Sequence, residues 1–230
     1  MSMLLRVEEI RDRRAVEELV RDAFWNVYEP GAHEHWLLHE LRKTEDFVPS
    51  LSVVAIDQMH RIVGYVAYSK AKLKLDGGSE KTLLCLGPIA VTPDWQKRGV
   101  GSQLIETTIQ MACQEGWGAI TLMGDPRYYR RFGFRVAERW DIRASNDMWA
   151  TGHLMLELIS GFLEAGKIQE SAVFEAKDDK TFEEFDRTFP VKDKAHQPSQ
   201  EEFAWMMSLM YPVNDAGNYR PSEMASMKSQ

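Results

Sequence analysis

Residues 96–101, QKRGVG, place glycines and positive side chains where a predicted strand passes into a predicted helix. A helix start leaves its first backbone N–H groups unpaired, with the positive end of the helix dipole behind them. Gly99 and Gly101 let the backbone approach a ligand closely, and Lys97 and Arg98 add positive charge. The pattern indicates a site for a phosphate group, although an ordinary turn with solvated side chains is the alternative.

Two common kinds of nucleotide site do not fit this loop. Neither GxxxxGK[ST] nor GxGxxG occurs, which argues against a Walker-type site and a dinucleotide site. Gln96, at the start of the loop, can orient it or donate a hydrogen bond. Another phosphorylated ligand therefore fits better.

The elements that position this loop form a mixed α/β domain around one sheet. Segments rich in β-branched and aromatic residues predict strands, and apolar residues at helical spacing predict helices. The predicted order is a strand and two helices within residues 3–43, a hairpin at 51–57 and 61–75, a strand at 82–91, a helix at 100–115, a strand at 119–124 and a short helix from Asp125.

Two prolines mark special positions in these elements. Pro88 follows Gly87 inside the strand at 82–91, and because proline cannot donate to a sheet ladder, we expect a bulge or a local parting of strands there. Pro126 follows Asp125 at a helix start, where aspartate caps the helix and the missing N–H of proline is not needed.

The pattern weakens after Trp140. Residues 153–159 and 170–176 predict strands, residues 177–199 a loose connector, and residues 199–210 a helix rich in methionine and aromatic side chains. We expect a main domain at residues 1–160. Residues 161–230 are then a C-terminal extension, partly irregular, with a short amphipathic helix.

Composition limits the possible partners. A net charge of −7 argues against a general nucleic-acid or anionic-membrane binder. No apolar run approaches the roughly 20 residues that cross a bilayer, and the N-terminus lacks a signal-peptide core, so we expect a soluble, cytoplasmic protein. The two cysteines, Cys85 and Cys113, predict buried, reduced thiols.

Two stretches of the sequence, taken in order, carry a resemblance to a known family. "LGPIAVTPDWQKRGVGSQLI" followed by "YYRRFGF" resembles the GNAT superfamily of acetyl-CoA-dependent N-acetyltransferases, and "GDPRYYRRFGF" looks like its bacterial YhbS-like subgroup. The resemblance covers residues 4 to about 160. It implies a mixed, mostly antiparallel sheet flanked by helices, with splayed central strands, and an acyltransferase that uses acetyl-CoA as co-substrate.

The resemblance also implies which residues hold acetyl-CoA. Its pantetheine amides would pair with the strand backbone at Ile89 and Val91, as an added strand would, and its pyrophosphate would sit on N–H groups of residues 98–102. The implied cofactor-binding residues are Ile89, Ala90, Val91, Gln96, Lys97, Arg98, Gly99, Val100, Gly101 and Ser102.

Tyr129 occupies the family's general-acid position, four residues before Gly133. With a pKa of about 10 its hydroxyl stays protonated at neutral pH and can donate to a thiolate, whose pKa is about 8.5. Filling of the core by an aromatic cluster is the alternative for Tyr129, and we expect Tyr128 to serve packing. The N–H of Val91 or a neighbour could support the oxyanion.

Several residues are candidates for the general base. The cofactor strand, residues 82–91, has no acidic residue of the kind that some family members use. HExxH is absent, so the three histidines within residues 33–39 indicate a helix face on the substrate side more than a metal site. "LMGDPRYY" also lacks the asparagine that many members use for pantetheine. The candidate bases are His33, Glu34, His35, His39, Glu40 and Asp125, the last already explained by capping.

Several readings of function stay open at this stage. The first is an N-acetyltransferase that acts, by direct attack in a ternary complex, on a small-molecule amine or a protein amino group. The second is a non-catalytic acyl-CoA-binding or interaction module, with the methionine-rich segment as a partner surface. An unrelated phospholigand-binding domain is the third. A homodimer is possible in each case.

Overall fold

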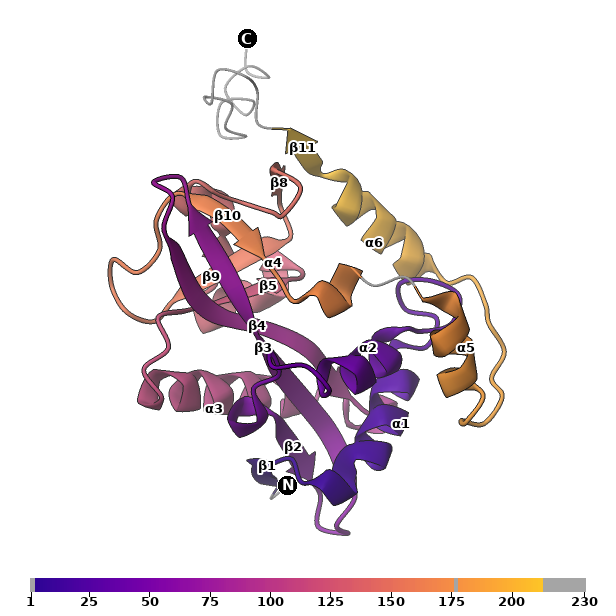
Figure 1. Cartoon of the computed structure of the whole chain (residues 1–230). Helices are drawn as coiled ribbons and strands as arrows, with labels where there is room; N and C mark the ends of the chain where they lie inside the picture. The colour runs from indigo at the N-terminus through magenta and orange to yellow at the C-terminus, as the bar shows by residue number, and fades with distance from the viewer. Residues whose placement is uncertain (1–2, 176–177, 213–230) are drawn as a thin grey trace.

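One mixed sheet organises the part of the chain that the computed structural model describes, residues 3–175 and 178–212 (Figure 1). Its strands are β1 (Leu4–Val7), β2 (Val53–Ile56), β3 (Ile62–Leu75), β4 (Glu80–Val91), β5 (Ala119–Met123), β6 (Arg135–Val136), β7 (Ile142–Arg143), β9 (His153–Glu157) and β10 (Gly166–Gln169). The order is β1-β2-β3-β4-β5-β9-β6, with β10 beside β3 and β7 beside β10. Neighbours are antiparallel except β4–β5 and β7–β10, so the predicted mixed, mostly antiparallel sheet is confirmed.

Helices cover both faces of the sheet (Figure 1). Because successive side chains of a strand point to opposite faces, Val66 packs under one helical layer and Tyr65 under the other. Leu104 belongs to the first layer, and Val16 and Leu38 belong to the second. The helices are α1 (Arg13–Phe24), α2 (Glu34–Leu41), α3 (Val100–Gln114), α4 (Pro126–Tyr129), α5 (Asp179–Asp186) and α6 (Pro198–Ser208), with 3-10 helices at Ile10–Asp12, Pro49–Leu51, Pro93–Trp95, Arg130–Phe132, Ala137–Trp140 and Ala172–Glu175.

β4 and β5 part after two paired positions. Leu84 pairs with Ile120 and Cys85 with Thr121, and neither strand pairs with the other beyond this point. The register between β3 and β4 shifts at the same level, so that residues 87 and 88 together stand opposite Ala67. The ladder interruption that the sequence predicts at Gly87-Pro88 is confirmed, and the splayed central strands leave a gap in the middle of the sheet.

The described C-terminal segment wraps the domain. After β10, α5 packs beside α2, with the Asp186 carboxylate 2.7 Å from the Arg21 guanidinium, and Trp25 Nε1 donates to the Asp193 carbonyl oxygen. α6 then follows, and β11 (Met210–Pro212) pairs with β8 (Met148–Ala150) in a separate ribbon. The helix predicted within residues 199–210 is confirmed as α6.

Two predictions for this segment were wrong. The strand expected at residues 170–176 is a 3-10 helix over Ala172–Glu175, because Val173 and Phe174 pack against the α1–α2 layer. The loose connector expected at residues 177–199 contains α5, which buries Phe182 against the domain. β10 lies beyond the expected domain boundary at residue 160 yet joins the main sheet, and the boundary itself stays a prediction.

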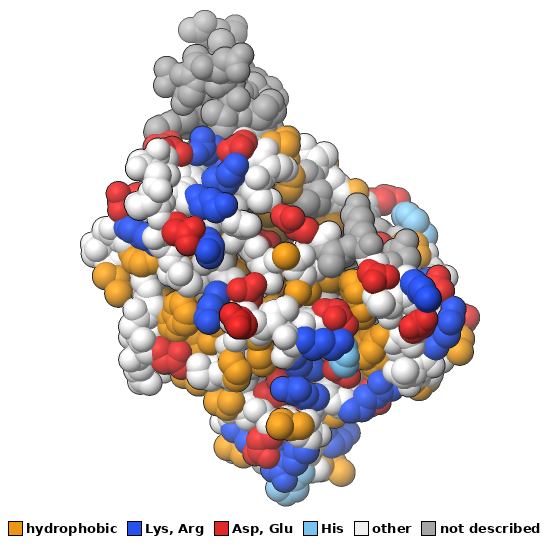
Figure 2. Space-filling model, in the orientation of Figure 1, with side chains coloured by type: hydrophobic (Ala, Val, Ile, Leu, Met, Phe, Trp, Pro, Cys, Tyr) orange, Lys and Arg blue, Asp and Glu red, His pale blue; other side chains and the backbone are white. Residues whose placement is uncertain are grey.

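The two cysteines differ in their exposure to solvent. Cys85 is buried as expected, but Cys113 is exposed, because it lies on the solvent side of α3. Basic and acidic side chains are interspersed on the face shown in Figure 2. None of the described helices combines the length and hydropathy that crossing a bilayer needs.

Candidate active site

The edge of β4 presents backbone groups to the gap. Thr92 N–H donates to the Val63 carbonyl oxygen at 3.0 Å, and in an antiparallel ladder such paired positions alternate with positions whose groups point the other way. Ile89 and Val91 therefore direct their N–H and C=O groups toward the gap. Ala90, opposite Tyr65, directs its own groups toward β3, so only two of the three predicted strand residues offer backbone to a ligand there.

The predicted anion loop lies beside this strand end. Gln96 Nε2 donates to the Val91 carbonyl oxygen at 3.2 Å, which ties the loop to the gap. Gly99 caps α3 in the left-handed conformation, with φ of 85°, and its carbonyl accepts the first α3 bond, from Gln103. The N–H groups of residues 100–102 precede that first donor and have no partner within the helix. A Cβ atom on Gly99 would meet nothing within 4 Å, so the outer side of the loop is open.

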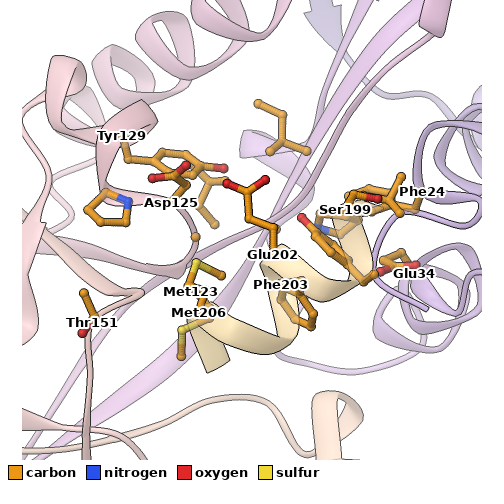
Figure 3. A pocket seen from close by; sticks show the side chains of 18 of the residues that line it. Phe24, Glu34, Met123, Asp125, Tyr129, Thr151, Ser199, Glu202, Phe203 and Met206 are labelled. Atoms are coloured by element: carbon orange, nitrogen blue, oxygen red, sulfur yellow. The ribbon is translucent and has the colours of Figure 1, made fainter. Parts of the chain in front are cut away.

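A cavity of about 910 Å³ lies over the gap. Both edges of the gap line it, through residues 85–89 of β4 and through residues 123–126, which begin with the last residue of β5. The ends of α1 and α2 form one wall, and α6 forms another (Figure 3). The remaining lining residues are Phe24, Val27, Tyr28, Glu34, Leu37, Arg127, Tyr129, Thr151, Glu170, Phe174, Ser199, Glu202, Phe203, Trp205, Met206 and Leu209.

Local structure fixes Tyr129 at the border of this cavity. The Asp125 carboxylate accepts the Arg127 N–H at 2.7 Å and caps the short α4, as predicted. Gly133 ends the following turn in the left-handed conformation, with φ of 94°, which turns the chain so that Phe134 enters the core. The rings of Tyr129 and Phe134 meet edge to face, with centroids 5.8 Å apart. The spacing of the motif therefore supports the tyrosine ring.

The Tyr129 hydroxyl is unengaged and stays protonated. It forms no hydrogen bond with the side chains and backbone of residues 3–175 and 178–212. Burial, followed by the nearby hydroxyls of Tyr28, Tyr128 and Tyr68, raises the pKa of Tyr129 above its ordinary value. A protonated hydroxyl facing the cavity is a proton donor.

Tyr128 faces the other way. A Cβ atom on Gly101 would lie 3.1 Å from its hydroxyl, so Tyr128 lies against the start of α3 and not in the cavity lining. Its ring also meets that of Phe132 edge to face at 5.5 Å. The predicted packing role of Tyr128 agrees with these contacts.

Most of the candidate bases lie elsewhere. Burial lowers the pKa of His35 to about 4, and its Nε2 lies 3.0 Å from the Asp186 carboxylate. His39 Nδ1 lies 2.9 Å from a Glu17 carboxylate oxygen, His33 pairs with Glu29, and Glu40 accepts a hydrogen bond from Lys43. None of these four side chains is among the residues that line the cavity. Among the described residues, no three His, Cys, Asp or Glu side chains gather closely enough to hold a metal ion.

Asp125 and Glu34 do line the cavity. Arg127 bonds to Asp125 and also lies 2.7 Å from Glu202, and its hydrogen bond lowers the pKa of Asp125 below the ordinary value. Within the described residues, no arginine or lysine side chain bonds to the Glu34 carboxylate. Burial raises its pKa to about 7, and its carboxylate accepts the His33 N–H at 3.1 Å.

Glu170 is a cavity residue that the sequence analysis missed. It follows β10, and its carboxylate oxygen Oε1 accepts a hydrogen bond from the Cys85 thiol, with 3.8 Å between Oε1 and Sγ. Cys85 is the last β4 residue paired with β5, so Glu170 lies where the gap opens. Burial raises the pKa of Glu170 above its ordinary value. The sequence held no signal for this carboxyl, because it stood in a segment predicted as a strand.

Comparison with known proteins places this geometry in a family. Residues 49–136 match the model of the acetyltransferase (GNAT) domain. The chain is 33% identical over 141 residues to the uncharacterized N-acetyltransferase YhbS of Escherichia coli K12, which covers 61% of this chain and 78% of that protein.

Solved structures agree with this match. The fold matches the crystal structure of E. coli YhbS in complex with CoA, with a TM-score of 0.66, 25% identity, and coverage of 76% of this chain and 93% of that one. It also matches a GNAT family acetyltransferase from Brucella melitensis in complex with acetyl-CoA, with a TM-score of 0.62, 25% identity, and coverage of 75% and 98%. The chain therefore belongs to the GNAT family of N-acetyltransferases.

Proposed function

We propose that this protein transfers the acetyl group of acetyl-CoA to a primary amine, by direct attack while both substrates are bound. The observation that carries the proposal is the cavity of about 910 Å³ whose floor is the β4–β5 gap and whose border holds the free hydroxyl of Tyr129. The CoA and acetyl-CoA bound to the two structural relatives support the choice of co-substrate. The acceptor is a small-molecule amine or a protein amino group.

Acetyl-CoA fits the residues that border the gap. The pantetheine amides would pair with the backbone groups of Ile89 and Val91 that point toward the gap, and the pyrophosphate would accept hydrogen bonds from N–H groups at the start of α3. Open space outside Gly99 leaves room for the phosphates. Lys97 and Arg98 add positive charge beside this start, and Gln96 holds the loop against Val91.

The transfer assigns a role to three groups. Glu170 accepts one proton from the acceptor ammonium, which leaves a neutral amine whose nitrogen bonds to the acetyl carbonyl carbon. A backbone N–H group of β4 donates to the oxygen on which negative charge develops. As the carbon–sulfur bond breaks, Tyr129 donates its proton to the thiolate and regains one from the new amide nitrogen. The products are the amide, the free thiol and a protonated Glu170.

The C-terminal extension is proposed to contribute to the acceptor site. Residues 1–160 would carry the acetyltransferase machinery, while residues 161–230 would supply Glu170 and the α6 wall of the acceptor site. The proposed location is the cytoplasm, where acetyl-CoA is available.

Calorimetric titration with acetyl-CoA tests the co-substrate assignment. We expect saturable binding that ATP and NADH do not reproduce, and its loss in Gly99→Asp, whose carboxylate would face the pyrophosphate. Gly99→Asn is the matched control, since asparagine also tolerates the left-handed conformation but carries no charge. Absence of acetyl-CoA binding to the folded wild-type protein, or equal binding by the aspartate and asparagine variants, contradicts this assignment.

A further inference from the structure

The cavity over the β4–β5 gap holds two carboxyl groups that form no ion pair with the described residues. Glu34 enters it from the start of α2 and Glu170 from the segment after β10. Glu34 bonds to backbone N–H and Glu170 to a thiol, and neither forms an ion pair with a basic side chain of the described residues. The basic side chain in the lining, Arg127, is already bound to Asp125 and Glu202. The cavity as a whole therefore attracts a cation.

The two carboxyls mark different parts of the cavity. Glu170 contacts Cys85, at the point where β4 and β5 part and the reaction is proposed. In Figure 3, Glu34 and Phe24 lie on the side opposite to Tyr129. A ligand that met both carboxyls would reach from the gap to the α1–α2 wall.

Apolar side chains line the space between these two parts. Figure 3 shows Phe203 and Met206 of α6 between Tyr129 and Glu34. The ring of Phe203 lies 4.4 Å from that of Tyr28, which in turn lies 5.7 Å from that of Phe24. Such a wall suits a hydrocarbon chain and attracts a cation near its ring faces.

We propose that the acceptor is an α,ω-diamine, a primary amine joined by an apolar chain to a second cationic group, with its reacting nitrogen at Glu170 and its distal ammonium at Glu34. This rests on the proposed function. Burial of an ionised Glu34 without a partner costs free energy, which is why its pKa is raised to about 7, and a distal ammonium removes that cost. A distal methyl group leaves the cost in place, and a distal carboxylate adds repulsion.

Three series of acceptors test the proposal: diamines, monoamines and aminocarboxylates, each with chains from propyl to octyl. At six carbons the matched members are hexamethylenediamine, hexylamine and aminocaproate. The readout is kcat/KM for acetylated product at about pH 8, where Glu34 is ionised and the amines are cationic. At the best chain length, we expect the diamine to exceed the monoamine by about tenfold or more, and the aminocarboxylate to be poorest. Glu34→Gln should bring the ratio of diamine to monoamine close to one.

The control variant is Glu40→Gln, on the same helix but outside the cavity, which should keep the wild-type ratio. Equal kcat/KM for diamines and monoamines at every length, or a ratio that Glu34→Gln leaves unchanged, overturns the diamine assignment while acetylated monoamine still supports the transferase. Absence of acetylated product from every amine, with acetyl-CoA bound, overturns both the proposed function and this inference.

Discussion

A Cβ atom on Gly124 would lie 2.5 Å from ring carbon Cε2 of Tyr129. The glycine at the end of β5 therefore leaves the space in which the tyrosine ring rests, and the ring can place its hydroxyl at the cavity only because that space is empty. The rigid ring cannot yield to an added methyl group without turning away from the gap.

Gly124→Ala should consequently lower kcat by about 10²-fold, because a displacement near 1 Å has that order of effect on a positioned group. Acetyl-CoA affinity, measured by calorimetry, should be unchanged. Gly77→Ala is the matched control, since a Cβ atom there meets nothing within 4 Å. Full turnover in Gly124→Ala would show that the position of the Tyr129 ring does not matter.

Glu170→Gln should remove the proposed general base. Because burial raises the pKa of Glu170, and the base must be ionised, wild-type kcat/KM should fall as the pH drops through a value above the ordinary 4.5. With a monoamine acceptor, which does not engage Glu34, the variant should lose this acidic limb and about 10²-fold or more in kcat. Glu175→Gln, which changes an exposed carboxyl near Glu170, should keep the limb. An unchanged pH profile in Glu170→Gln would assign the base elsewhere.

Phe203→Ala tests the contribution of α6 to the acceptor site. The Phe203 ring packs on that of Tyr28 over the cavity, so its truncation removes apolar contact from the amine and not from acetyl-CoA. We expect KM for the amine to rise about tenfold, from the loss of one to two kcal/mol of burial, with acetyl-CoA affinity unchanged. Val191→Ala, at a position 98% exposed in the same segment, is the control. An unchanged KM for the amine would remove α6 from the acceptor site.

His153 should make stability depend on pH. Burial lowers its pKa from 6.5 to about 4, so between these values the unfolded chain binds a proton that the folded protein excludes. The free energy of unfolding contributed by this group is present above pH 6.5 and falls as the pH drops toward 4, by at most about 1.4 kcal/mol per pH unit.

His153→Gln should flatten this dependence by up to one proton, while glutamine can still bond to Thr121, which lies 3.0 Å from the histidine Nε2. The measurement is urea unfolding of both proteins at several pH values. His35 and Glu34 shift stability in opposite directions over part of the same range, but both occur in each protein and cancel in the difference. Parallel slopes for the two proteins would contradict the assignment.

Local sequence predicted the elements that carry the proposed cofactor site. Gly99 has to adopt positive φ at a strand–helix junction, Pro88 cannot donate to the ladder, and Asp125 caps its own helix, so each effect acts within a few residues. The strand expected at 170–176 failed because Val173 and Phe174 satisfy their burial by packing on α1 and α2 in another conformation.

The acceptor site could not be predicted in this way. Glu170 and Cys85 meet although they are separated by 85 positions in the sequence, and Phe203 reaches Tyr28 only because residues 187–197 run along α1. Glu34 and Glu40 lie on the same helix, but Glu34 lines the cavity whereas Glu40 binds Lys43, and the spacing of charged residues does not specify which of the two faces the cavity.

The acetyl transfer is tested most directly by amine-dependent release of CoA from the wild-type protein and from Tyr129→Phe, with the acetylated amine identified by mass spectrometry. We expect one acetylated amine for each CoA released, and a fall of about 10²-fold or more in kcat for Tyr129→Phe with unchanged acetyl-CoA binding. Acetyl-CoA binding without transfer to any amine would contradict it and identify a non-catalytic acyl-CoA-binding module, and equal turnover by the two proteins would remove Tyr129 from the mechanism.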